Sequence, residues 1–350
     1  MLCLCLVSGV PAQAADSATA DPNLTDDRRL SEPLTLPNWF KNSFLEMEDD
    51  LDAAVKAGKR GLIIYFHRDD CPYCKAHLEH NWGRKDIAAY TRKHFDVITI
   101  NVRGDRDVLD FDQTVSTEKE FALRHHANFT PSLIFYDANG RVALRLVGYR
   151  PPYQFRAALE YVADGHYRKE NFRAYLARGE RATSFGQDTL NEHDAFGRPP
   201  YILDRSRITG QRPLVVFFEE RRCHPCDVLH GGPLSDDGTT GKLLALDAVQ
   251  LDMWSNTPVV TPDGRRMNAK QWADRMGLSY APTLIFYDER GAEIIRVDSV
   301  VGFFRLNRVL DYVVSGGYRQ EPSFIKWREQ QRAERERKNK PPHIPAFTED

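Results

Sequence analysis

The sequence predicts an α/β protein with two similar domains, each a central mixed β-sheet flanked by helices. Short apolar runs of strand length alternate with segments whose apolar residues have helical spacing. The same order of elements then occurs a second time, and a C-x-x-C pair follows the first long strand of each half. At 350 residues the chain also has the length of two ordinary domains.

In the first half, residues 39–57 have helical spacing and predict a helix. The pair Cys71-Pro72-Tyr73-Cys74 follows a predicted strand at Leu62–His67 and opens a second helix. Thr117-Glu118-Lys119-Glu120 is a T-x-x-E capping box, which predicts another helix start. The remaining predicted elements are a strand at Val97–Val102, a proline-led strand at Thr130–Asp137, a hairpin strand at Val142–Val147 and a helix at Pro152–Ala163.

The second half repeats this order at a nearly constant offset. Cys71 and Cys223 are 152 residues apart, and Pro131 and Pro282 are 151 apart. The sequence Leu-Ile-Phe-Tyr-Asp is identical in both halves. A repeat of this length indicates a duplicated whole domain. The predicted elements are strands at Leu214–Glu219, Val249–Met253, Ala281–Asp288 and Ile294–Val297, a helix start at Asn268–Gln271 and a helix near Leu306.

Composition and local patterns suggest how the rest of the chain is organised. Residues 2–10 are apolar and Ala12-Gln13-Ala14 has the small-residue pattern of a signal-peptide cleavage site, although no basic residue precedes them. Export implies a soluble periplasmic protein. We expect a signal peptide at 1–14, a disordered leader at 15–37, a first domain at 38–179, a linker at 180–204, a second domain at 205–320 and a charged tail, solvated or docking, at 321–350.

Charge and hydropathy argue against two classes of protein. The formal net charge is −2, so no basic excess is present to neutralise the phosphates of a nucleic acid. Apolar runs stay well short of the roughly 18 residues of a membrane helix. We therefore expect neither a nucleic-acid partner nor an integral membrane protein.

The two C-x-x-C pairs predict redox chemistry. A cysteine at a helix N-terminus lies near unpaired backbone N–H groups and the positive end of the helix dipole, which stabilise its thiolate. Cys71 and Cys223 are therefore expected to attack disulfides, while Cys74 and Cys226 resolve the mixed disulfide. Permanently closed structural disulfides remain an alternative.

Other uses of these cysteines and of nearby histidines fit the spacing less well. The two pairs are too far apart in sequence for a usual zinc ribbon, and neither pair is followed by the histidine that haem attachment needs. His77 and His80 lie at helical spacing and His125 is followed by His126, yet no further ligand is convincingly placed beside them. We expect no metal and no cofactor.

The order of elements around the cysteines resembles the thioredoxin superfamily. Thr130-Pro131 and Ala281-Pro282 stand where that superfamily carries its cis-proline loop, and residues 261–288 are similar to periplasmic bacterial thioredoxin-like proteins, including those of sulfur-oxidation systems. The resemblance implies tandem thioredoxin-fold domains, cis bonds before Pro131 and Pro282, and substrate backbone contacts at these loops.

The resemblance also implies the activity of a thiol–disulfide oxidoreductase. Its partners would be protein or small-molecule thiols and disulfides, together with a membrane redox partner. The direction of electron flow stays open, with a reductase favoured. The alternative is a non-catalytic binding or chaperone-like module that keeps the same fold.

One departure from thioredoxins concerns proton transfer. Tyr65 and Phe217 stand where thioredoxins carry a buried carboxylate, six residues before the first cysteine. His67 and Glu219 lie two residues further along and face the same side of the strand. They are the candidates for a proton shuttle, and the alternative, which the pattern favours, is that both are ordinary polar residues at a strand end or on the surface.

The charges that precede the two pairs predict different redox potentials. Asp69 and Asp70 oppose a thiolate at Cys71, whereas Arg221 and Arg222 favour one at Cys223. A stabilised thiolate stabilises the reduced form, so the second pair is expected to be more oxidising than the first. The alternative is that these four charges are solvated loop residues without effect on either pair.

Overall fold

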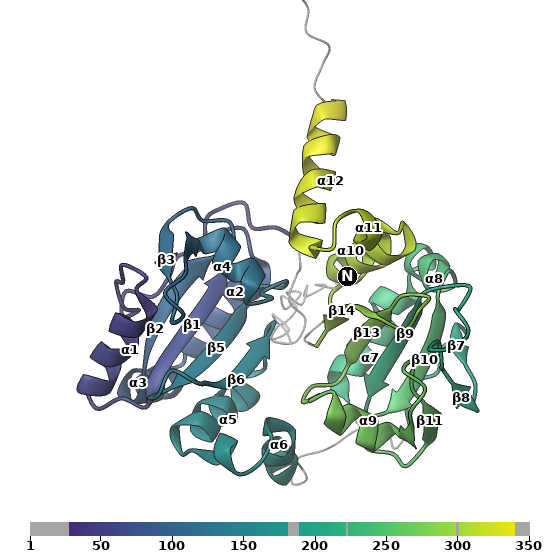
Figure 1. The fold of residues 1–350 in the computed structure, drawn as a ribbon, viewed down its shortest axis with the longest axis horizontal. Coiled ribbons are helices and arrows are strands. Elements are labelled where there is room, and N and C mark those ends of the chain that lie inside the picture. The colour runs from purple at the N-terminus through teal and green to yellow at the C-terminus, as the bar shows by residue number, and fades with distance from the viewer. Residues whose placement is uncertain (1–27, 181–188, 222, 299–300, 340–350) are drawn as a thin grey trace, which may run out of the picture.

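The structure is a computed structural model that describes residues 28–180, 189–221, 223–298 and 301–339. Two domains lie side by side, and helix α12 (Phe324–Asn339) projects from the region between them (Figure 1). Each domain is built on a mixed sheet with helices against it, which confirms the predicted tandem α/β fold.

The first domain has a four-stranded sheet in the order β2-β1-β5-β6. Strand β1 (Gly61–His67) pairs in parallel with β2 (Phe95–Asn101) and antiparallel with β5 (Ser132–Asp137), which pairs with β6 (Val142–Val147). Every residue of β1 and β5 is buried, which explains their apolar runs. The other elements are α1 (Met47–Lys56), α2 (Pro72–His77), a π-helical turn (Leu78–Trp82), α3 (Lys85–His94), β3 (Asp107–Leu109), β4 (Val115–Thr117), α4 (Glu118–Arg124), α5 (Pro152–Ala163), a 3-10 turn (His166–Arg168) and α6 (Phe172–Glu180).

The second domain repeats this sheet and adds a fifth strand, in the order β14-β13-β9-β10-β7. Strand β9 (Leu214–Glu219) lies between the parallel β10 (Asp247–Asp252) and the antiparallel β13 (Thr283–Tyr287). Leu284 faces Phe217 as Leu133 faces Tyr65, so the duplication extends to the strand register. The other elements are β7 (Phe196–Gly197), β8 (Tyr201–Ile202), α7 (His224–Gly231), a 3-10 turn (Pro233–Ser235), α8 (Asp237–Leu243), β11 (Pro258–Val260), β12 (Arg266–Asn268), α9 (Ala269–Arg275), β14 (Glu293–Val297), α10 (Phe303–Val314) and α11 (Gly317–Gln320).

The N-terminal part of the first domain differs from the prediction. The helix expected over residues 39–57 begins only at Met47, because Leu45 has a left-handed φ of 65° and Lys41 donates its backbone N–H to the Val97 carbonyl at 2.8 Å. Residues 28–37, assigned to a disordered leader, follow a defined path in the structure. Leu34, for example, donates its backbone N–H to the Asp69 carbonyl at 3.0 Å.

The expected linker and tail also contain structure. In the linker, β7 pairs with β10 and β8 pairs with β11, so this segment extends the second domain's sheets. In the tail, Phe324 and Trp327 are buried in the second domain's core, which holds α12 against it. The predicted signal peptide at 1–14 lies outside the described residues. Among the described residues, none belongs to a helix that is long and apolar enough to cross a membrane.

Each domain also contributes one aromatic side chain to the core of the other. Phe129 is packed in the second domain's core, where its ring centroid lies 5.6 Å from that of Phe324. Tyr280, at the equivalent position of the second domain, is packed in the first domain's core. We call this arrangement the reciprocal insertion.

Candidate functional site

Cys71 lies at the N-cap of α2 and is surrounded by hydrogen-bond donors. Its Sγ accepts a hydrogen bond from the Cys74 backbone N–H at 3.0 Å and another from the Thr130 hydroxyl at 3.2 Å. Cys71 and Cys74 form a disulfide, and both are fully buried. The donors that face this sulfur will face the thiolate when the disulfide is reduced.

Cys223 lies at the N-cap of α7, as Cys71 does at the N-cap of α2, but its Sγ accepts no hydrogen bond from the side chain of its proline loop. Its Sγ accepts from the Cys226 backbone N–H at 3.1 Å, and the two cysteines form a disulfide. Ala281 stands where the first domain has Thr130, and alanine has no hydroxyl to offer. The two sites therefore share a backbone geometry and differ in their side chains.

The Thr130-Pro131 and Ala281-Pro282 peptide bonds are both cis in the structure. The Thr130 carbonyl, the group expected to pair with a substrate backbone, accepts a hydrogen bond from Arg305 Nη2 at 3.2 Å. Arg305 belongs to α10 of the second domain, so that domain lies over the proline loop of the first. A role of these four residues in substrate contact stays a prediction.

Further contacts hold each domain over the active-site region of the other. The Gly302 backbone N–H donates to the Tyr73 hydroxyl at 3.1 Å, and the Arg305 guanidinium lies 3.9 Å from the centroid of the Tyr73 ring. In the opposite direction, Arg150 lies 4.4 Å from the centroid of the Tyr280 ring. Both proline loops are therefore part of the domain interface.

The acidic residues before Cys71 do not act as the sequence suggested. Asp70 forms ion pairs with Arg68, Arg29 and Arg103. Burial works to raise the pKa of Asp70, but the neighbouring guanidinium groups lower it below its ordinary value. Asp70 is thus compensated, and positive charge surrounds Cys71.

The arginines preceding the second pair lend it less support than expected. Arg221 forms an ion pair with Asp252, and Arg222 lies outside the described residues. The charge argument for a more oxidising second pair is therefore wrong about Asp70, whereas Asp69 accepts a hydrogen bond from Asn101 Nδ2 at 3.2 Å. It overlooked arginines that are distant in sequence. The relative potentials of the two pairs stay a prediction.

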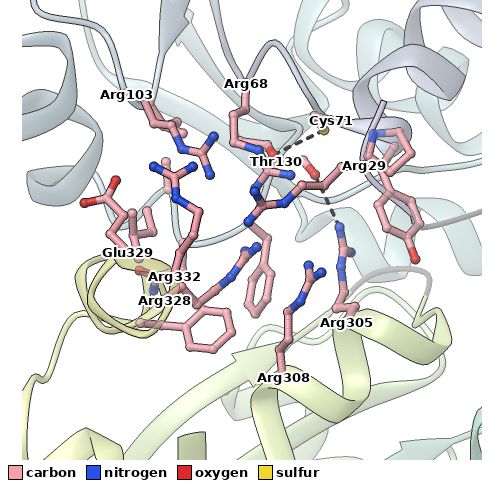
Figure 2. Close-up of a pocket in the computed structure, with 18 residues that line it drawn as sticks. Arg29, Arg68, Cys71, Arg103, Thr130, Arg305, Arg308, Arg328, Glu329 and Arg332 are labelled. Carbon is pink, nitrogen blue, oxygen red and sulfur yellow. Dashed lines mark hydrogen bonds between the residues drawn. The ribbon is translucent and has the colours of Figure 1, made fainter. Parts of the chain in front are cut away.

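A pocket lined by arginines opens beside Cys71 and Thr130 (Figure 2). We call it the arginine pocket. Its guanidinium groups come from both domains and converge on one space. The single carboxylate among the described residues that line it belongs to Glu329, which is 3.1 Å from Lys119 Nζ. The arginines are Arg29, Arg68, Arg103, Arg305, Arg308, Arg328 and Arg332.

His67, a candidate proton shuttle, is buried at the end of β1. Its imidazole stacks on Tyr65 with ring centroids 5.9 Å apart, and Nδ1 is 3.8 Å from an Asp69 oxygen. Burial lowers the pKa of His67, although Asp69 and Glu118 partly oppose this effect. The ring is therefore neutral near pH 7 and able to accept a proton.

Glu219, the second candidate, is fully buried and held by two side chains. Its carboxylate lies 2.9 Å from His230 Nε2 and accepts from Gln250 Nε2 at 3.0 Å. His230 follows Cys226 by one helical turn on α7, so Glu219 and His230 form a hydrogen-bonded pair between β9 and the redox helix. The sequence indicated Glu219 but gave no sign of its partner.

His77, weighed as a metal ligand, lies in the core of the first domain instead. Its Nδ1 is 3.0 Å from Asn81 Nδ2, and burial lowers its pKa to about 3. His125 is hydrogen-bonded to Asp110 at 3.0 Å. Within the described part of the chain, no group of three His, Cys, Asp or Glu residues is arranged to hold a metal ion.

Comparison with known families gives two matches, one for each domain. The sequence model of the family described as a thioredoxin-like domain matches residues 47–163 and 202–314, more than half of the chain. Each matched segment contains one C-x-x-C pair and one proline loop. Among curated proteins, none matches the chain.

Three of the similar solved structures each match about one domain of this chain. A thioredoxin-fold protein from Helicobacter pylori is 23% identical over 41% of this chain and 94% of its own, with a TM-score of 0.33. A disulphide isomerase from Xylella fastidiosa Temecula1 is 18% identical over 43% of this chain and 98% of its own, with a TM-score of 0.24. The C-terminal domain of DsbD from Neisseria meningitidis is 16% identical over 33% of this chain and 92% of its own, with a TM-score of 0.26. Scores this low transfer no substrate or partner.

Proposed function

The chain is a thiol–disulfide oxidoreductase of the thioredoxin-like domain family, and we propose that it works outside the cytoplasm as a two-domain reductase. Cys71 and Cys223 attack the substrate disulfide, and Cys74 and Cys226 resolve the mixed disulfide. The observation that carries this proposal is the pair of hydrogen bonds that Cys71 Sγ accepts from Cys74 and Thr130.

Thiolate stabilisation supports an order for the electrons within the chain. The Thr130 hydroxyl and the arginines near Cys71 favour the reduced form of the first pair, so its disulfide is the stronger oxidant. Electrons then pass from Cys223–Cys226 to Cys71–Cys74 and on to the substrate. This order is the reverse of the one that the local charges predicted.

Proton transfer is the second part of the proposal. The resolving cysteine must lose its proton to attack, and in the second domain we assign its acceptor to the Glu219–His230 pair. In the first domain the corresponding group is His67. Glu219→Gln is expected to slow release of the mixed disulfide from Cys223 and to change its pH dependence, whereas Glu219→Asp, which keeps a carboxylate on β9, should retain more of both.

Export and a membrane redox partner complete the proposal. The apolar residues 2–10, followed by Ala12-Gln13-Ala14, support export. A reductase in an oxidising compartment needs a continuous supply of electrons, which a membrane donor of dithiol chemistry provides. Cell fractionation and N-terminal sequencing of the mature chain test this part.

Disulfide reduction by single-site variants tests the activity itself. With dithiothreitol as reductant, the full chain is expected to reduce 2-hydroxyethyl disulfide, with activity lost when both Cys71 and Cys223 are replaced by serine. Cys74→Ser and Cys226→Ser should each trap a mixed disulfide. If the wild-type chain turns over no faster than the doubly substituted chain, the reductase activity is refuted and the alternative, a non-catalytic binding module of the same fold, is supported.

A further inference from the structure

The second domain blocks the route by which an extended peptide would reach Cys71. The Thr130 carbonyl is already bonded to Arg305, and Phe129 is inserted in the core of the second domain. A substrate strand would have to displace both contacts before it could pair with this loop. Cys71 nevertheless lines the arginine pocket, so a small molecule bound there would lie beside Cys71 without having to pair with the proline loop.

The pocket is strongly positive. Seven arginines line it, whereas Glu329 pairs with Lys119 and Asp70 is shared among three arginines at its edge. Burial, together with the positive charges of Arg68 and Arg308, lowers the pKa of Arg328 from its ordinary value. Arg332 also lies 3.6 Å from a carboxylate oxygen of Glu336 on the same helix. Among the described residues, the lining of the pocket thus brings together seven guanidinium groups and the one carboxylate of Glu329. Such a site is stabilised by an anion from outside.

The type of cation narrows the class of anion. Guanidinium groups bind planar or tetrahedral oxyanions through paired N–H donors, and carboxylates and sulfonates both fit this geometry. The guanidinium groups enter from several sides, from the first domain and from α10 and α12 (Figure 2). A ligand with an anionic group on each side of its reacting atoms can therefore bind arginines on opposite sides of the pocket at the same time.

We propose that the arginine pocket binds a small anionic disulfide, with carboxylate or sulfonate groups flanking the S–S bond, and presents that bond to Cys71. This inference rests on the proposed reductase function and names its substrate class. Arginines from α10 and α12 make the second domain part of the first domain's substrate site.

The reaction is balanced without any redox group beyond the two cysteines. The Cys71 thiolate attacks one substrate sulfur, the S–S bond breaks, and the first thiolate leaves. Cys74 passes its proton, by way of His67 as proposed above, to the first thiolate released. It then attacks Cys71 Sγ, forms the Cys71–Cys74 disulfide and releases the second thiolate. Two electrons pass from the dithiol to the substrate, and an external dithiol restores the reduced pair.

Three matched disulfides test the charge preference. The probes are dithiodipropionate (anionic), 2-hydroxyethyl disulfide (neutral) and cystamine (cationic), each reacted with the reduced full chain carrying Cys223→Ser and Cys226→Ser. The rate of each probe with the protein is divided by the rate of the same probe with dithiothreitol. This division corrects for the intrinsic reactivity of each disulfide toward thiols. We expect the anionic probe to exceed the cationic one by on the order of tenfold at low salt, and added salt to reduce this ratio. Glutathione disulfide and tetrathionate then distinguish carboxylate from sulfonate substrates.

Variants on α12 locate the effect. Arg328→Gln combined with Arg332→Gln should lower the anionic-to-cationic ratio several-fold. The rate with the neutral probe reports separately any change in the reactivity of the Cys71 thiolate, which the ratio of the two charged probes does not contain. Arg337→Gln, on the same helix and outside the pocket, is the matched control. A ratio near one, or one that Arg337→Gln lowers equally, overturns the inference. Failure of all three probes to oxidise the pair instead refutes the proposed reductase, so the two failures are distinguishable.

Discussion

Thr130→Val removes one of the two hydrogen bonds that Cys71 Sγ accepts and leaves the side-chain volume nearly unchanged. A hydrogen bond to a charged group contributes about 1.5–3 kcal/mol, and sulfur is a weak acceptor, so the lower end applies. For a two-electron couple, about 1.4 kcal/mol corresponds to roughly 30 mV. We therefore expect the reduction potential of Cys71–Cys74 to fall by about 30 mV, because the reduced form loses stabilisation.

The assay is equilibration with glutathione of the full chain carrying Cys223→Ser and Cys226→Ser, followed by tryptophan fluorescence. Thr130→Ser keeps the hydroxyl and should stay near the wild-type potential. Ala281→Thr adds the hydroxyl at the equivalent position and should raise the potential of Cys223–Cys226, measured in a chain that carries Cys71→Ser and Cys74→Ser instead. If Thr130→Val leaves the potential unchanged, the hydroxyl does not stabilise the thiolate and the proposed order of electron flow loses its main support.

Three further predictions concern stability and the domain interface. Because burial lowers the pKa of His77 to about 3, the unfolded chain binds a proton there that the folded chain does not, so stability is lost as the pH falls from about 6.5 towards 3, by up to about 1.4 kcal/mol per pH unit. Leu229 stands at the equivalent position of the second domain, so His77→Leu is a conservative test. In urea titrations this variant should show a free energy of unfolding that depends less on pH in this range. Trp327→Ala should cost about 3–5 kcal/mol of unfolding free energy, since the indole is buried against Tyr312; no loss would mean that α12 does not complete the core. Arg305→Ala should increase insulin reduction by freeing the Thr130 carbonyl, and unchanged turnover would show that this contact does not limit protein substrates.

The predictable features of this chain are those with local causes. The capping boxes at Thr117 and Asn268 are present as the sequence indicated, because each needs only a side chain three residues away. Helix α5 spans the predicted Pro152–Ala163, where apolar spacing and a proline at its first turn agree. The central strands follow from their apolar runs.

The features that were missed depend on residues distant in sequence. The interpretation of Asp70 failed because its partners Arg29 and Arg103 come from other segments that only the fold brings together. His230, eleven residues after Glu219, becomes its partner through the packing of α7 on β9. The arginine pocket likewise joins residues from both domains, and the spacing of these arginines in the sequence does not predict that they meet.

The reciprocal insertion couples the folding of the two domains. A domain expressed alone would keep Phe129 or Tyr280 on its surface and would leave a hole where the other aromatic ring belongs. Both losses weaken the isolated domain, so the two halves should unfold in one transition rather than two. Because the inserted rings stand beside the proline loops, local opening of the interface would expose both redox pairs together. Access of an extended peptide to the disulfides is in this way part of the same equilibrium that holds the protein folded.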